Sequence, residues 1–308
     1  MGEILVFGHK NPDTDSICSA LVKANLENKL GKNVKAVRLG NVNKETQYVL
    51  DYLKIEAPEF VSNIENGTEV MLVDHNEFDQ SADNIENLKI LSVTDHHRIS
   101  NFHTSEPLYY NAKPYGCTNT LLFEEYKANN VEIDYKIAIL MISAIISDTL
   151  LLKSPTCTKF DIDVFSELEK IAGIDARDYG MKMLKAGTDL STYSATEIVN
   201  LDAKEFTEKG KKIVVAQVNT ADIDDVFSRK EELIFAMEKE INDRNLELFL
   251  FVITDIVNTN SKIIALGNLK GVVEKAFDKK LDEDDSMFLE GVMSRKKQIA
   301  PPLLANLD

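Results

Sequence analysis

The first half of the chain alternates short apolar runs with longer segments of helical periodicity. The apolar runs predict buried strands at residues 4–7, 34–37, 70–73 and 90–93. The helical segments fall at residues 16–29, 46–53, 118–128, 135–147, 161–171 and 176–184. Strands that alternate with helices are joined by right-handed crossovers, which gives a parallel sheet with helices on both faces. The pattern therefore predicts an α/β domain built on a parallel sheet.

The second half follows a different pattern. It predicts strands at residues 212–217, 246–255 and 261–266 and helices at residues 225–242 and 271–277. The last two strands are separated by Asn258-Thr259-Asn260, which indicates a hairpin. This is typical of a smaller α/β domain with a mixed sheet. Because the polar stretch 186–192 breaks the periodicity, we expect a first domain at 1–187, a linker at 188–192 and a second domain at 193–308.

Composition and charge narrow the class of partner. Of 308 residues, 44% are hydrophobic and 28% are charged, which is ordinary for a soluble globular protein. The net charge of -16 repels nucleic acid and anionic membranes, so we expect neither as a partner. An anionic ligand must then be bound by a local cluster of cations. The longest apolar run, 137–146, is shorter than the roughly 20 residues that span a bilayer.

The cysteines and the N-terminus favour a cytoplasmic protein. Three cysteines cannot form a fully paired disulfide framework, and none of them shows zinc-type CxxC spacing. This indicates a reducing compartment. The N-terminal residues also lack the basic segment and cleavage site of a signal peptide.

Candidate chemistry follows three of the predicted strands. His9 comes after strand 4–7, Asp74 after strand 70–73, and the run Asp95-His96-His97 after strand 90–93. The carboxyl ends of parallel strands lie at one edge of a sheet, where ligands bind in open α/β folds. We therefore expect these side chains to converge. Each has a plainer alternative as a solvated strand end, and His96 and His97 need not have the same role, because neighbours on an extended chain point to opposite sides.

The loop after the first strand adds two carboxylates to His9. Asp13 and Asp15 lie within seven residues of it, although a turn residue and a helix cap are the plainer interpretations of the pair. Asp148 follows a very apolar helix, where a buried carboxylate is costly unless a metal compensates it; the alternative is that it is exposed. Mixed nitrogen and oxygen ligands suit Mn, Co, Fe or Zn. The six candidate ligands are sufficient for two ions about 3.5–4 Å apart, as in phosphoryl hydrolysis: His9, Asp13, Asp15, Asp74, His96 and Asp148.

The second domain supplies the cations that such a substrate needs. The run Ser294-Arg295-Lys296-Lys297 is dense in positive charge, although most charge runs are merely solvated. If the linker acts as a hinge, Arg295 and Lys296 could clamp a phosphate when the domains close. Lys204 taken alone is an ordinary surface lysine.

Five motifs occur in order along nearly the whole chain and resemble the family II inorganic pyrophosphatases of the DHH phosphoesterase superfamily. They are Gly8-His9-Lys10-Asn11-Pro12-Asp13-Thr14-Asp15-Ser16, Val73-Asp74-His75-Asn76-Glu77, Asp95-His96-His97, Ser147-Asp148-Thr149 and Ser294-Arg295-Lys296-Lys297-Gln298. Two further stretches are similar, Tyr115-Gly116-Cys117-Thr118 and Ala216-Gln217-Val218-Asn219.

The resemblance implies hydrolysis of pyrophosphate to two orthophosphates by a hydroxide that bridges two metal ions at the domain interface. His9 and Asp13 would then hold the first ion and Asp15, His96 and Asp148 the second, with Asp74 bridging both. His97 would hydrogen-bond the substrate and help to protonate the leaving phosphate. The pyrophosphate oxygens would be bound by Lys204, Arg295 and Lys296.

The resemblance also implies cofactors and assembly. We expect two Mn²⁺ per subunit, with Co²⁺ as a substitute, and Mg²⁺ bound with the substrate. Members of the family are typically homodimers joined through the N-terminal domain. Some carry regulatory nucleotide-binding inserts, but the interval from Asp74 to Asp95 is too short for one here.

Three alternatives remain at this stage. An oligoribonucleotide phosphodiesterase of the same superfamily would carry a Gly-Gly-rich loop, and no Gly-Gly occurs in the sequence. An exopolyphosphatase needs the same metals and cations, so it stays open. A non-enzymatic metal or phosphate sensor would have lost a ligand or a cation, and no matched position departs from the family pattern.

Overall fold

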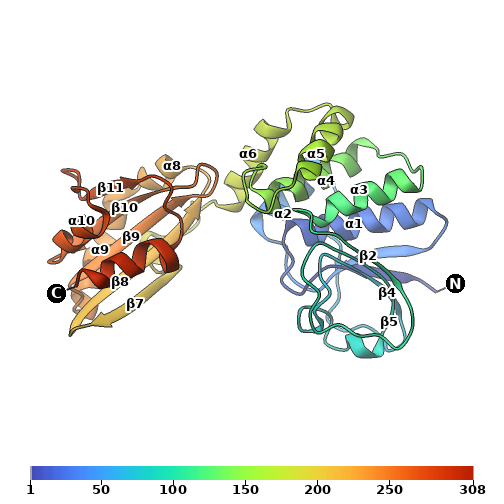
Figure 1. The fold of residues 1–308 in the computed structure, drawn as a ribbon, viewed down its shortest axis with the longest axis horizontal. Coiled ribbons are helices and arrows are strands. Elements are labelled where there is room, and N and C mark those ends of the chain that lie inside the picture. Colours follow the sequence, from blue (N-terminus) through green and yellow to red (C-terminus); the bar gives the residue numbers. More distant parts are fainter. Residues whose placement is uncertain (1, 308) are drawn as a thin grey trace. The chain divides into compact units, whose positions relative to one another are not determined.

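The computed structural model describes residues 2–307. The chain divides into two compact units after Gly187, and each unit contains its own β-sheet (Figure 1). We refer to residues up to Gly187 as the N-terminal unit and to residues from Thr188 onward as the C-terminal unit.

The sheet of the N-terminal unit has six strands in the order β3-β2-β1-β4-β5-β6, and all neighbouring pairs are parallel. The strands are β1 (Ile4–Phe7), β2 (Val34–Arg38), β3 (Glu59–Phe60), β4 (Glu69–Val73), β5 (Lys89–Asp95) and β6 (Tyr109–Ala112). This confirms the parallel α/β sheet expected from the sequence. The order reverses between β1 and β4, and ligands bind at such a switch point in open α/β sheets.

Helices cover one face of this sheet, and Figure 1 shows α1, α3 and α4 grouped there. The helices are α1 (Thr14–Lys29), α2 (Lys44–Leu53), α3 (Thr118–Ala128), α4 (Tyr135–Thr149), α5 (Lys159–Ala172) and α6 (Ala176–Gly187). Ala20 and Ala24 of α1 pack with Val6 of β1. The opposite face is covered by two 3₁₀ turns, η1 (Phe78–Gln80) and η2 (Ile85–Asn87), through a cluster that includes Ile85 and Leu72. The sequence predicted helices on both faces, but on this face the connection from β4 to β5 forms 3₁₀ turns in place of an α-helix.

Helix α4 is apolar on all sides because it contacts α1, α3 and α5. Every residue from Ile137 to Ile146 is buried. Among residues 2–307, no helix is both long enough and apolar enough to cross a membrane. The expectation that Asp148 lies beyond this helix is wrong, since α4 continues to Thr149.

The sheet of the C-terminal unit is mixed, as expected. Its strands are β7 (Ala203–Glu208), β8 (Lys211–Thr220), β9 (Leu248–Asp255), β10 (Asn260–Gly267) and β11 (Ser286–Leu289), in the order β11-β10-β9-β8-β7. Only β8 and β9 are parallel, and the hairpin between β9 and β10 is confirmed. The helices are α7 (Ala195–Asn200), α8 (Ile223–Phe227), α9 (Lys230–Arg244), α10 (Lys270–Phe277) and α11 (Ala300–Ala305), with a π-helical turn η3 (Arg295–Ile299).

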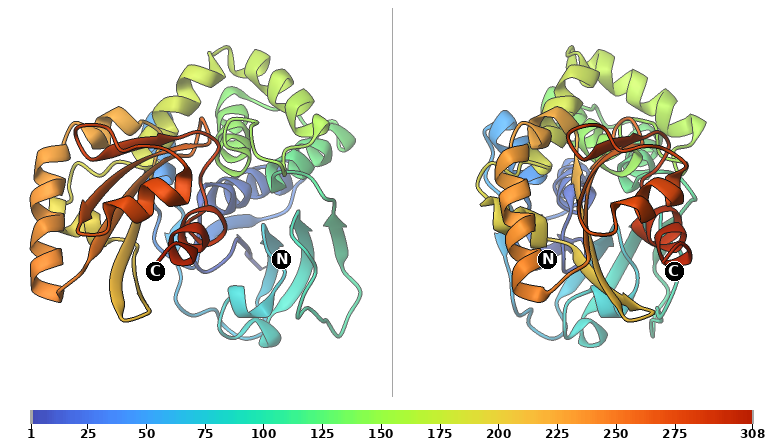
Figure 2. Two further views of the ribbon diagram at one scale, coloured as in Figure 1. Left: turned by 60° about the vertical axis from the view of Figure 1, so that its left-hand side comes forward. Right: turned by 90° about the vertical axis from the view of Figure 1, so that its left-hand side faces the viewer.

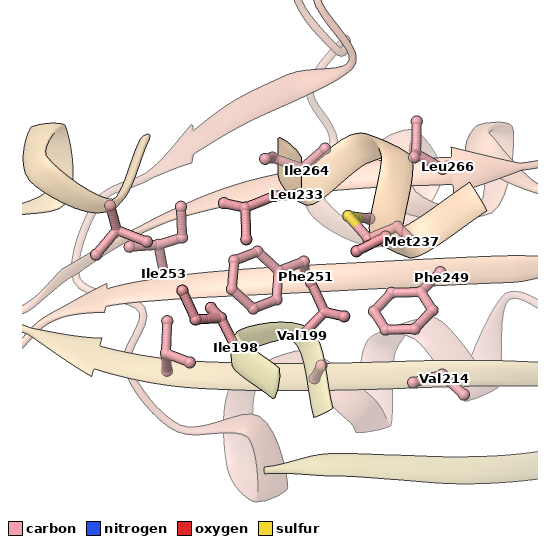
Figure 3. Close-up of a cluster of buried hydrophobic side chains, with 14 of the residues drawn as sticks. Ile198, Val199, Val214, Leu233, Met237, Phe249, Phe251, Ile253, Ile264 and Leu266 are labelled. Carbon is pink, nitrogen blue, oxygen red and sulfur yellow. The ribbon is translucent and has the colours of Figure 1, made fainter. Parts of the chain in front are cut away.

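Strand β9 is buried along its whole length because both faces of the sheet are covered. Phe249 and Phe251 lie in a cluster with Leu233 and Met237 of α9 (Figure 3). The alternate residues of β9 lie in a second cluster with α10 and α11. The right-hand view of Figure 2 shows α9 and α11 on opposite sides of this sheet.

The single helix expected at 225–242 is wrong, since α8 and α9 are separate helices. The break falls at Ser228 and Arg229. Ser228 donates a side-chain hydrogen bond to the carbonyl of Asp225 (2.7 Å), a local contact that competes with helix continuation. The Arg229 guanidinium donates to the carbonyl oxygens of Leu190 and Tyr193. These tertiary contacts have no signal in the local periodicity.

Candidate metal centre

The polar side chains that follow three neighbouring strands meet at the carboxyl edge of the N-terminal sheet. β1 and β4 are paired directly, so His9 and Asp74 leave the sheet beside each other at the switch point. β5 pairs with β4 on its other side, and His96 follows β5. The edge itself therefore brings together groups that are 22 to 87 residues apart in the sequence.

All six candidate ligands, together with His97, lie in three overlapping groups of nitrogen and oxygen atoms. Within each group the atoms lie within 4.8 Å of one another. The groups are His9, Asp13 and Asp74; Asp15, Asp74, His96 and Asp148; and Asp74, His96 and His97. Asp74 is common to all three. Its carboxylate therefore joins the group that contains His9 to the larger group that contains His96.

Two carboxylate oxygens of this centre are buried without a hydrogen-bond donor. Oδ2 of Asp74 and Oδ2 of Asp148 accept no hydrogen bond from any residue between 2 and 307. A buried carboxylate oxygen without a donor is costly. Asp74 is also only 1% exposed and has a left-handed backbone (φ 58°), which non-glycine residues rarely adopt. A bound cation would satisfy both oxygens.

The spacing of the imidazoles and carboxylates also fits shared ions. Nε2 of His9 lies 3.5 Å from Oδ2 of Asp13 and 3.5 Å from Oδ2 of Asp74. Nε2 of His96 lies 3.5 Å from Oδ1 of Asp74 and 3.6 Å from Oδ2 of Asp148. Two ligands of one ion, each about 2.1 Å from it in tetrahedral geometry, lie about 3.4 Å apart. The observed separations match that distance.

The electrostatics of the centre favour positive charge. Burial alone would lower the pKa values of His9 and His96, but their carboxylate neighbours outweigh burial. Contacts with Asp13 and Asp74 raise the pKa of His9 to about 10. Contacts with Asp74 and Asp15 raise the pKa of His96 to about 9. The carboxylates around both imidazoles therefore favour a positive charge at this place.

The carboxyl groups of the centre repel one another. Burial and the Asp15 charge raise the pKa of Asp74 to about 6. Burial, Asp15 and Asp74 also raise the pKa of Asp148 well above its usual range. Asp15 is the exception: burial works against its ionisation, but the charge of His96 and several donors lower its pKa to about 2. A cation would relieve this repulsion.

Residues at the start of α3 donate hydrogen bonds to these ligands. The sequence analysis did not predict this supporting role. The backbone N–H of Thr118 donates to Oδ2 of Asp15 (2.7 Å), and the Thr118 hydroxyl donates to Oδ1 of Asp74 (3.0 Å). The Asn119 amide donates to Oδ1 of Asp15 (2.8 Å). The only sequence signal was the familial stretch Tyr115-Gly116-Cys117-Thr118, which by itself suggested no role.

The helix cap at the start of α1 is Asp13 and not Asp15. Asp13 caps α1, with Oδ1 accepting from the backbone N–H of Ser16 (3.0 Å), while its other oxygen faces His9. Asp15 is fully buried and is not the cap.

His97 is oriented by its own motif. Its Nδ1 lies 2.9 Å from Oδ1 of Asp95, and its side chain is 51% exposed. Asp95 in turn accepts a hydrogen bond from Asn76 (2.6 Å). The contact with Asp95 raises the pKa of His97. His97 lines an open pocket with His9, Asp74 and Arg98, so its free edge is available to a ligand.

The other two histidines lie outside the three groups. Burial lowers the pKa of His75 to about 4, and its ring contacts the carbonyl of Val73 and the hydroxyl of Ser81. The ring of His103 packs against Phe78.

The three candidate cations belong to the C-terminal unit. Lys204 is on β7, exposed, and pairs in register with Val215 of β8. Arg295 donates to the carbonyl of Val215 and to Oδ1 of Asp202 (2.8 Å), which places it near Lys204. Lys296 is exposed in the same π-helical turn as Arg295. These cations therefore share one region of the C-terminal unit.

Two family models match the chain. The DHH family, N-terminal domain, matches residues 3–145, and the DHHA2 domain matches residues 181–306. A manganese-dependent inorganic pyrophosphatase of Bacillus subtilis is 56% identical over 304 residues, which is 98% of each chain. The chain belongs to the family of manganese-dependent inorganic pyrophosphatases. The family resemblance expected from the motifs is thus confirmed, and the enzyme is a hydrolase.

Further comparisons agree with this family. A probable manganese-dependent inorganic pyrophosphatase of Bacillus velezensis is also 56% identical over 98% of both chains. Among solved structures, a putative family II inorganic pyrophosphatase of Methanococcus jannaschii has a TM-score of 0.62 and 40% identity, and the match covers 98% of this chain and 99% of that one. An exopolyphosphatase-related protein of Bacteroides fragilis shares the fold at a TM-score of 0.51 and 14% identity.

Proposed function

We propose that this pyrophosphatase hydrolyses pyrophosphate to two orthophosphates with two divalent ions held at the carboxyl edge of the N-terminal sheet. The observation that carries the proposal is Asp74, a buried and strained carboxylate common to all three groups of candidate ligands. His9 and Asp13 would hold the first ion. Asp15, His96 and Asp148 would hold the second, and Asp74 would bridge both.

The donor set supports Mn²⁺. Two imidazoles and four carboxylates form a mixed nitrogen and oxygen set. The buried oxygens of Asp74 and Asp148 that accept no hydrogen bond mark where cations would bind. Co²⁺ would substitute, and Mg²⁺ would enter with the substrate. When bound, paired ions lower the pKa of water to about 7 and neutralise phosphate charge.

His97 would hydrogen-bond the substrate and help to protonate the leaving phosphate. Two observations support this role. The contact of Nδ1 with Asp95 raises the pKa of the ring, which favours the protonated form that a proton donor needs. The side chain is half exposed beside His9 and Asp74, where a substrate has access.

Lys204, Arg295 and Lys296 would bind the pyrophosphate oxygens. A chain of net charge -16 needs a local group of cations for an anionic substrate, and these three share one region of the C-terminal unit. We further propose that residues 188–192 are the linker between domains 1–187 and 193–308, and that the substrate is held by both domains.

We also infer the setting of the enzyme. The three cysteines are free, as in a reducing cytoplasm. The negative charge opposes binding to nucleic acid or anionic membranes. The family favours a homodimer joined through the N-terminal domain.

A phosphate-release assay tests the proposal. Purified protein with Mn²⁺ is offered pyrophosphate, tripolyphosphate or a dinucleotide at equal concentration. We expect pyrophosphate to be hydrolysed fastest. Preference for tripolyphosphate would indicate an exopolyphosphatase, preference for the dinucleotide a phosphodiesterase, and either result would overturn the proposal.

A further inference from the structure

Asp161 of α5 has no place among the candidate ligands, yet it is completely buried. Its carboxylate accepts four hydrogen bonds, and four is enough to satisfy both oxygens. Two of them are local and come from the backbone N–H of Thr158 (2.7 Å) and from its hydroxyl (2.6 Å). The first belongs to the capping box of α5, in which the Thr158 hydroxyl oxygen accepts in return from the backbone N–H of Asp161 (3.3 Å). The other two come from residues more than 40 positions away.

These distant donors are at either end of one short segment. The backbone N–H of Gly116 donates to Oδ2 of Asp161 (2.9 Å), and the Thr120 hydroxyl donates to Oδ1 (2.7 Å). Next to Asp161, the ring of Phe160 stacks on Tyr115, with centroids 4.9 Å apart. The beginning of α5 therefore holds residues 115–120 through three contacts, at Tyr115, Gly116 and Thr120.

The segment held in this way makes direct contacts with three candidate ligands. The carbonyl of Tyr115 lies 3.0 Å from Nδ1 of His96, which turns Nε2 of that ring toward Asp74 and Asp148. Thr118 and Asn119, on the same segment, donate to Asp15 and Asp74 as described above. Partners of this kind fix the ring orientation of a metal ligand and the basicity of the site.

Gly116 shows how closely the segment is packed. A Cβ atom there would lie 2.9 Å from Oδ2 of Asp161 and 2.9 Å from Cγ2 of Thr149. Thr149 directly follows Asp148. The backbone at Gly116 thus fits between the Asp161 carboxylate and the end of α4, the helix that carries the candidate ligand Asp148.

We propose that Asp161 is a positioning residue for the metal centre: by holding Gly116 and Thr120, it sets the geometry of Asp15, Asp74 and His96. This inference rests on the proposed function, because it assumes that these side chains bind metal ions. It assigns a role to a residue that touches neither substrate nor ligands.

Mn²⁺ titration of the metal-free, full-length protein by calorimetry tests the proposal. We expect Asp161→Ala to bind the more affected ion about 10–100-fold more weakly than the parent. The matched control is Thr158→Ala, which breaks the same capping box but leaves the bonds to Gly116 and Thr120; we expect its affinity to stay within about threefold of the parent. The visible absorption spectrum of bound Co²⁺ should change in Asp161→Ala and not in Thr158→Ala.

Two further variants keep the test decisive. In Asp161→Asn the amide oxygen can take the position of Oδ2, and the amide NH₂ can donate to the Thr120 hydroxyl, which then accepts instead of donating. The Mn²⁺ affinity of this variant should therefore stay within about threefold of the parent. If Asp161→Ala does not fold, Thr120→Val removes one bond only and should still weaken Mn²⁺ binding at least threefold.

The outcomes separate the two proposals. If the parent itself binds no Mn²⁺, the proposed function fails. If the parent binds Mn²⁺ and Asp161→Ala binds it as tightly as Thr158→Ala, the positioning role of Asp161 is refuted while the proposed function stands. Unchanged affinity in Thr120→Val would also count against the positioning role.

Discussion

Asp74 is the residue whose surroundings point most directly to a bound cation. It leaves β4 with a left-handed backbone, lies 1% exposed among other carboxylates, and has one oxygen without a donor. Its pKa is raised to about 6 by burial and by Asp15. Each of these features costs free energy in the absence of a cation.

Asp74→Asn should reduce pyrophosphate hydrolysis by more than about 100-fold, because loss of a mere outer partner already costs about 10–100-fold and Asp74 faces both groups of ligands. Phosphate release at saturating Mn²⁺ measures the effect. Asp163→Asn, an exposed position on α5, is the control and should keep full activity. Turnover of Asp74→Asn within tenfold of the parent would contradict the bridging role.

Arg295→Ala and Lys296→Ala should each lower turnover about 10–100-fold, since hydrogen bonds to charged groups contribute about 1.5–3 kcal/mol. Their Mn²⁺ affinity should stay within about twofold of the parent. Lys297→Ala, in the same π-helical turn, is the matched control and should be active. A collapse of Mn²⁺ affinity in either variant would show that the division of roles between the two units is wrong.

At the residue scale, the sequence predicted the groups that follow strands and missed the groups that support them. His9, Asp74 and His96 could be found because the end of each strand is visible in the apolar pattern. Asp161 could not, because its partners Gly116 and Thr120 are more than 40 residues away and hydrogen bonds of that kind leave no periodic signal.

At the scale of elements, a buried ion pair joins α1 to α3. Nζ of Lys23 lies 2.7 Å from Oε2 of Glu125 and 2.8 Å from Oε1 of Glu27, and the lysine side chain is 3% exposed. The hydroxyl of Thr94 on β5 and the amide of Asn111 on β6 complete the shell of Glu125. Removing one partner of such a pair leaves an uncompensated buried charge.

Lys23→Met should therefore lower the free energy of unfolding by about 3 kcal/mol, measured by urea denaturation at pH 7. Lys29→Met, on the exposed side of the same helix, should cost less than about 1 kcal/mol. Equal losses in the two variants would show that burial of the pair has no special effect.

Acid should reduce the difference between Lys23→Met and the parent. Burial opposes ionisation of Glu27, but Lys23 outweighs burial and lowers its pKa below the usual 4.5. A lowered pKa contributes stability that is complete above the unfolded value and is lost as pH falls through the folded value. The difference in unfolding free energy should thus narrow below about pH 4.5; a constant difference would contradict this assignment.

The strands that the sequence did not predict are β3, β6, β7 and β11. All four are edge strands of their sheets. An edge strand is covered on fewer sides, so it needs no continuous apolar run; in β7, for example, four of six residues are exposed. The central strands were found because burial on both faces requires apolar residues throughout.

At the scale of the whole molecule, the two units carry opposite kinds of chemistry. The N-terminal unit supplies the buried carboxylates and imidazoles, whereas the candidate cations Lys204, Arg295 and Lys296 are in the C-terminal unit. The sequence predicted both sets. Periodicity alone could not predict which carboxylates would be buried, because Asp15, Asp74 and Asp148 resemble ordinary caps and turns until the fold brings them together.

The number of Mn²⁺ ions needed for activity tests the central claim most directly. The protein is stripped with a chelator, Mn²⁺ is added back in steps, and bound metal and pyrophosphate turnover are measured on the same samples. The stripped protein should be inactive, and activity should reach its maximum at two bound Mn²⁺ per chain, with Co²⁺ restoring it better than Zn²⁺. Full activity after stripping, or a maximum at one ion per chain, would contradict a centre in which Asp74 bridges two metals.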